Sequence, residues 1–132
     1  MKYNPHKYQS YATDFIVNNP IAAIFLEMGL GKSVITLTAM KKLFETETIC
    51  KVLVIAPLRV ARDTWPQEIR KWDHLKGMKY AVAVGTEAER KAAVLRNEPV
   101  TIINRENVDW LINKSGLPFD FDMVVIDELS SF

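Results

Sequence analysis

The chain has 132 residues, 48% of them hydrophobic and 25% charged, with a formal net charge of +1; these values predict one globular domain with its own core. Its single cysteine, Cys50, excludes a disulfide or a cysteine metal cluster within the chain and is expected to be buried among apolar neighbours. No apolar run approaches the length of a membrane span and the N-terminus lacks the apolar core of a signal peptide, so we expect a cytoplasmic protein that is not secreted and meets no membrane.

The first predicted element is a short amphipathic helix within residues 3–20. Asn18-Asn19-Pro20 ends it, because the residue before a proline avoids the helical conformation. Gln9 lies near its start and, taken alone, reads as an ordinary exposed helix residue.

A glycine-containing loop follows, between an apolar run at 21–26 and a helical pattern over 34–44. Strand, glycine loop and helix in this order favour a phosphate-binding loop, because inward N–H groups and a helix N-terminus attract anions. Lys32 would then reach the β- and γ-phosphates, and the Ser33 hydroxyl would complete the shell of a Mg²⁺ ion. Leu26 stands where the common GxxxxGK[ST] pattern has its first glycine, so the loop alone leaves open a plain helix N-terminus with a solvated lysine.

Four further strands are predicted from short apolar runs, at 52–55, 80–85, 100–104 and 123–126. The segments between them favour helices. In the first of these, Pro66 suits an initial helical position, with Thr64 and Gln67 able to form a capping box. Trp65, Ile69 and Trp72 would form one apolar face of this helix. In the next helix, the expected buried side consists of Ala92, Ala93 and Leu95. This alternation predicts an α/β fold, mainly a parallel sheet with helices on both faces.

Two acids, Asp127 and Glu128, come directly after the last predicted strand. Because ligands of parallel α/β sheets bind beyond the carboxyl ends of the strands, we expect these acids near the glycine loop. One carboxylate would hold Mg²⁺ and the next would polarise an attacking water. The alternative is a pair of exposed acids that cap a helix.

Basic residues outnumber acidic ones between Lys51 and Lys79, and Arg59 and Arg62 lie just past the end of a predicted strand. This distribution is compatible with a nucleic-acid surface and equally with scattered solvated charge.

Taken in order, these motifs resemble the Swi/Snf-type translocases of helicase superfamily two. The segment from Glu27 to Ser33 is similar to that family's first motif, which tolerates a non-glycine at the place of Leu26. Tyr8-Gln9 resembles the Q motif, whose glutamine reads the adenine edge. Asp127-Glu128-Leu129-Ser130 resembles the DExx box, although relatives carry Ala-His or Gly-His in its second half.

Two more segments resemble elements that face nucleic acid in this family. Val54 to Leu58, with the helix after it, is similar to motif Ia, and Thr101 to Glu106 stands where the family has a strand that also lines the nucleic-acid track.

The resemblance implies the first RecA-like lobe of a DNA-dependent ATPase that uses ATP and Mg²⁺ and moves along duplex DNA without sequence preference. It implies catalytic roles for Lys32, Asp127 and Glu128, and Mg²⁺ ligation by Ser33 and Asp127. The implied ATP-binding residues are Gln9, Met28, Gly29, Leu30, Gly31, Lys32 and Ser33. The implied nucleic-acid contacts are Pro57, Leu58, Arg59, Asn104 and Arg105.

We further expect that residues 1–132 are this lobe alone, cut shortly after the DExx box, with the second lobe absent and little hydrolysis as a result. The short spacing between motifs favours a bacterial or phage protein. Two alternatives stay open at this point: the lobe of an RNA helicase of the DEAD-box kind, and a non-catalytic module that binds nucleotide or DNA.

Overall fold

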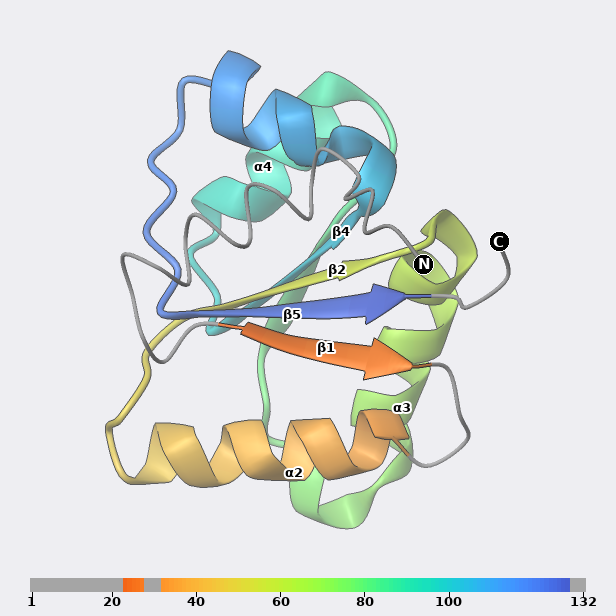
Figure 1. The fold of residues 1–132 in the computed structure, drawn as a ribbon, viewed down its shortest axis with the longest axis vertical. Coiled ribbons are helices and arrows are strands. Elements are labelled where there is room, and N and C mark those ends of the chain that lie inside the picture. Colours follow the sequence, from red (N-terminus) through yellow and green to blue (C-terminus); the bar gives the residue numbers. More distant parts are fainter. Residues whose placement is uncertain (1–22, 28–31, 129–132) are drawn as a thin grey trace, which may run out of the picture.

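The computed structural model of the protein describes residues 23–27 and 32–128 (Figure 1). Its centre is one sheet of five strands, all parallel, in the order β1-β5-β2-β4-β3. The strands are β1 (Ala23–Glu27), β2 (Val52–Ala56), β3 (Tyr80–Ala83), β4 (Val100–Asn104) and β5 (Met123–Glu128). The predicted α/β fold with a parallel sheet is therefore confirmed.

Helices cover both faces of the sheet, as predicted (Figure 1). The helical segments are α2 (Lys32–Glu45), η1 (Val60–Thr64), α3 (Trp65–Lys71), η2 (Asp73–Leu75), α4 (Glu87–Leu95), η3 (Arg105–Asn107) and η4 (Trp110–Lys114). The connections that lead from β1 through β2 to β3 contain α2 and α3 and cover one face of the sheet. The connections that lead back from β3 through β4 to β5 contain α4 and η4 and cover the other face. In the part of the chain that the structure describes, no helix is long and apolar enough to cross a membrane.

The central strands β2 and β4 are buried along their whole length, which is why their sequences read as unbroken apolar runs. Alternate side chains of these strands enter two separate cores. Leu53, Ile55 and Ile103 pack with Leu111 under α4 and η4, whereas Val54 and Ile102 pack with Leu37 and Trp65 under α2 and α3. The sheet is thus held from both sides, which fixes the positions of its strand ends.

The helix after β2 begins earlier than predicted, and the expected capping box is wrong. Thr64 already has helical backbone angles (φ −71°, ψ −51°), and its side chain makes no cap hydrogen bond. The preceding turn, η1, is a π-helix in which the Trp65 N–H donates to the Val60 carbonyl five residues back. A proline ring would collide with the carbonyl four residues before it in a regular α-helix, and this wider turn accommodates Pro66.

Three positions that were expected to be buried are exposed instead. In α4 the buried residues are Ala93 and Val94, while Leu95 is 65% exposed and Ala92 is also exposed. Cys50 is exposed as well, because its backbone N–H donates to the Asp122 carboxylate at 2.7 Å in the turn before β2 and neighbouring Ile49 takes the buried position.

Candidate functional site

The carboxyl ends of β1 and β5 lie side by side at one edge of the sheet (Figure 1). The two strands are parallel neighbours, and their register pairs Leu26 with Asp127 and Glu27 with Glu128. Paired strands lie about 4.8 Å apart. The loop that leaves β1 and the two acids that end β5 therefore start from adjacent points, as the sequence predicted.

Helix α2 returns from this edge under the sheet and begins at Lys32. Its first turn contains Ser33, which is half-buried, and no acidic residue. Unpaired N–H groups and the helix dipole favour an anion at such an N-terminus. The predicted contacts of Gln9, Met28, Gly29, Leu30 and Gly31 lie outside the described residues, and so do Leu129 and Ser130.

Asp127 occupies a half-buried position on β5, and its carboxylate is held by a tryptophan. The Trp65 indole Nε1 donates a hydrogen bond of 3.0 Å to Asp127 Oδ2. Removal of water from the carboxylate raises the pKa of Asp127 above its usual 3.8, and the indole hydrogen bond opposes that rise only in part. At neutral pH an ionised carboxylate at this place therefore costs folding free energy.

A hydroxyl and a carboxylate at this edge are donors that fit Mg²⁺. Mg²⁺ prefers oxygen ligands, keeps several waters, and in nucleotide sites uses one or two carboxylates together with the phosphates. Ser33 and Asp127 supply donors of this kind from α2 and β5.

Replacing Asp127 with asparagine is expected to raise the melting temperature of the nucleotide-free chain at pH 7. Because the folded pKa lies above the unfolded one, the folded state binds this proton more tightly, and the free energy of unfolding falls as pH rises through that interval. Asparagine removes the charge and keeps an oxygen for the Trp65 indole. Thermal unfolding in EDTA measures the gain, which should shrink as pH is lowered towards 3.8.

The control for this variant is Asp73→Asn, because the Asp73 side chain is 94% exposed. It should change the free energy of unfolding by no more than about 0.5 kcal/mol. A melting temperature of Asp127→Asn equal to or below that of the unmodified chain would contradict the electrostatic cost assigned to Asp127.

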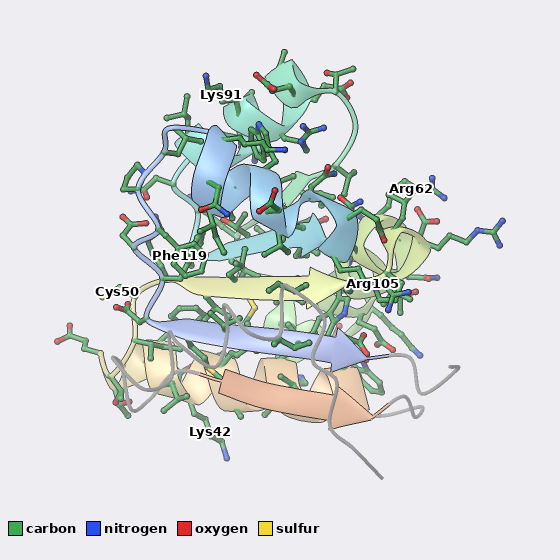
Figure 2. All side chains as sticks on the ribbon, turned by 45° about the horizontal axis from the view of Figure 1, so that its top comes forward. Lys42, Cys50, Arg62, Lys91, Arg105 and Phe119 are labelled. Carbon is green, nitrogen blue, oxygen red and sulfur yellow. The ribbon has the colours of Figure 1, made fainter. Side chains whose placement is uncertain are left out.

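The predicted nucleic-acid residues also start from adjacent strand ends at this edge. Ala56 pairs with Asn104, so the segment after β2 and the segment after β4 leave the sheet together. Pro57 is buried, whereas Leu58 is 43% exposed and Arg59 is also exposed. Figure 2 shows Arg62 and Arg105 on the side where the strand arrows end, with Cys50 and Phe119 at the opposite end.

Asn104 is buried rather than displayed at the surface, and it organises the turn after β4. Its Nδ2 donates to Glu106 Oε2 at 3.2 Å, and its Oδ1 accepts from Asn107 Nδ2 at 2.6 Å. The turn so formed carries Arg105, which is half-buried with its Nε 3.7 Å from Glu106 Oε1. Asn104 thus supports the position of Arg105.

The profile of the SNF2-related domain matches residues 17–131. The chain belongs to the SNF2-related family. The match begins before β1 and runs past β5, so it includes the whole described sheet of this SNF2-related domain, whose fold is RecA-like.

This SNF2-related domain is similar to a protein of a phage and to a protein of a plant. Protein p41 of Acyrthosiphon pisum secondary endosymbiont phage 1 is 33% identical over 129 residues, which are 96% of this chain and 28% of that protein. Protein CHROMATIN REMODELING 5 of Arabidopsis thaliana is 32% identical over 126 residues, which are 92% of this chain and 7% of that protein. The chain therefore spans less than a third of the length of either relative.

Sequence reasoning missed the contact of Trp65 with the candidate site residue Asp127. The spacing of Trp65 with Ile69 and Trp72 predicted a place on the apolar face of a helix, and Trp65 is indeed completely buried. Its partner Asp127 lies 62 residues away in the sequence, so no local pattern announces the hydrogen bond.

Proposed function

We propose that this domain is the first, ATP-binding lobe of a DNA-dependent ATPase that moves along duplex DNA. In the proposal the Gly29–Ser33 loop and Lys32 hold the phosphates, Gln9 selects adenine, and Met28 and Leu30 complete the loop. Ser33 and Asp127 ligate Mg²⁺, which supplies charge stabilisation at the phosphates, and Glu128 orients the attacking water. The observation that carries the proposal is the parallel pairing of β1 with β5, which supports one shared site for the loop and the acids.

The proposal also assigns a role in hydrolysis to a second lobe. Arginines supplied across a cleft are worth about 10³–10⁵ in rate in related phosphoryl transfer. We therefore expect residues 1–132 to bind nucleotide weakly and to hydrolyse it slowly until that lobe is supplied. The relation to a phage protein supports a bacterial or phage-infected cytoplasm as the setting.

The experiment that tests the nucleotide site is a titration of the chain with a fluorescent ATP analogue, in Mg²⁺ and in EDTA. Because Ser33 and Asp127 would hold the Mg²⁺ that accompanies the phosphates, affinity should be clearly higher with Mg²⁺ than in EDTA. Because Gln9 is proposed to select adenine, a GTP analogue should bind less well than the ATP analogue. Equal affinity in Mg²⁺ and EDTA would contradict the proposed site, and rapid multiple-turnover hydrolysis by the chain alone would contradict its dependence on a second lobe.

The nucleic-acid surface is tested by Arg59→Ala, with duplex DNA binding measured at several salt concentrations. Loss of one phosphate contact should weaken binding at every sequence and lower the slope of log affinity against log salt by about 0.9. Lys91→Ala is the control, because Lys91 is exposed on α4 away from the strand ends (Figure 2). Equal slopes for the two variants, or tighter binding to single-stranded RNA than to duplex DNA, would contradict this part of the proposal.

A further inference from the structure

The hydrogen bond between Trp65 and Asp127 joins the core to the candidate metal site. The indole Nε1 of Trp65 lies 3.0 Å from Asp127 Oδ2, so it engages one of the two carboxylate oxygens. An indole N–H only donates, and it stays neutral at every pH that the fold survives. The bond therefore fixes the orientation of the Asp127 carboxylate. It also favours the form of Asp127 in which Oδ2 carries no proton.

The donor in this bond is immobile. Trp65 is 0% exposed and packs in the same core as Leu37 and Met40 of α2 and Val54 of β2. A side chain so enclosed keeps one rotamer, because interiors are packed at crystal-like density. The position of the Asp127 carboxylate is thereby tied to the core beneath α2, the helix that begins at Lys32.

The other two indoles of the chain show that this arrangement is particular to Trp65. Trp72 is 36% exposed and donates to Glu68 on its own helical segment at 2.7 Å. Trp110 is buried in the core on the opposite face of the sheet, and its Nε1 has no acceptor among the described residues. Burial of an indole in this fold therefore does not by itself require a carboxylate partner.

We propose that Trp65 is a positioning residue for Asp127, which holds Oδ2 from the side of α3 so that Oδ1 is presented to Mg²⁺ or to one of its waters. This role rests on the proposed nucleotide site and adds to it a residue from outside the loop and the acid pair. Residues that orient a metal-binding group typically change metal affinity by about 10- to 100-fold when they are replaced. Phenylalanine at position 65 keeps most of the ring and removes the donor.

The test compares Trp65→Phe with Trp110→Phe, which removes an indole that has no acceptor among the described residues from the other core. Binding of a fluorescent, non-hydrolysable ATP analogue is titrated with Mg²⁺, and separately measured in EDTA. Trp65→Phe should raise the Mg²⁺ concentration for half-maximal binding about 10-fold or more. It should leave binding in EDTA unchanged, and Trp110→Phe should match the unmodified chain in both.

A second measurement needs no change at Trp65. In ¹⁵N-labelled chain without nucleotide, Asp127→Asn should shift the Trp65 indole resonance and leave the Trp110 resonance in place. In the unmodified chain, addition of Mg²⁺ to the nucleotide complex should again move the Trp65 resonance alone. These spectra report the hydrogen bond itself, independently of the stability of any tryptophan variant.

The outcomes separate this role from the function on which it rests. Equal Mg²⁺ requirements for Trp65→Phe and Trp110→Phe would overturn the positioning role, and so would a Trp65 indole resonance that does not shift in Asp127→Asn. Neither result would contradict the proposed nucleotide site. Nucleotide binding by the unmodified chain with no Mg²⁺ dependence would overturn the proposed site, and the role of Trp65 with it.

Discussion

Replacing Lys32 with alanine is expected to lower the affinity of the chain for a Mg²⁺-bound ATP analogue by about 10- to 150-fold. This range follows from the loss of charge-assisted hydrogen bonds to phosphate, each worth about 1.5–3 kcal/mol. Lys32 opens α2 directly after the glycine loop, where the proposal gives its ammonium group to the β- and γ-phosphates. A titration with a fluorescent analogue measures the loss.

The matched control is Lys42→Ala, which removes a cation from the same helix. Lys42 lies in the last turn of α2 and is exposed, far from the strand ends (Figure 2). It should leave nucleotide affinity within about twofold of the unmodified chain, because exposed charges more than a Debye length away are screened. Equal losses in the two variants would show that only the general charge of α2 matters and would contradict the assigned role of Lys32.

The largest expected effect on stability comes from Leu53→Ala, which should lower the free energy of unfolding by about 3–5 kcal/mol. Leu53 lies on β2, the central strand, is 0% exposed, and packs in the core under α4 and η4. The cost combines lost burial with the cavity that remains, since the sheet between two covered faces relaxes little. Chemical denaturation followed by circular dichroism measures it.

Leu95→Ala makes the same chemical change at the surface and is the control. Leu95 is 65% exposed at the end of α4, so its replacement should alter the free energy of unfolding by no more than about 0.5 kcal/mol. This pair also tests the burial pattern of α4, because the sequence predicted Leu95 to be a core residue. Comparable losses at both positions would contradict the burial pattern described for α4.

The strands were predictable from the sequence, because a parallel sheet covered on both faces requires continuous apolar runs. Val100–Asn104 was predicted with its observed bounds, and Val52–Ala56 within one residue. The helices were less predictable from the sequence than the strands. Pro66 indicated a helix start, but η1 widens the turn before it and lets the helix begin earlier. Rules that consider only local propensity do not predict this wider turn.

The candidate site was likewise predictable from the sequence only in part. Its general place followed from the rule that ligands lie beyond the carboxyl ends of parallel strands. The register that pairs Glu27 with Glu128 joins residues about a hundred positions apart, and only the sheet as a whole determines it. The contact of Trp65 with Asp127 and the burial of Asn104 depend likewise on packing between distant segments.

We propose that the loop after β1 and the acids that end β5 border one Mg²⁺-bound triphosphate, and Mn²⁺ tests this proposal directly. Mn²⁺ accepts the same oxygen ligands as Mg²⁺ and broadens nearby amide resonances through its unpaired electrons. In ¹⁵N-labelled chain with a non-hydrolysable ATP analogue, added Mn²⁺ should broaden the amides of Ser33 and Asp127 together and leave Cys50, at the opposite edge, sharp (Figure 2). Broadening of Ser33 without Asp127, or of Asp127 without Ser33, would contradict the claim.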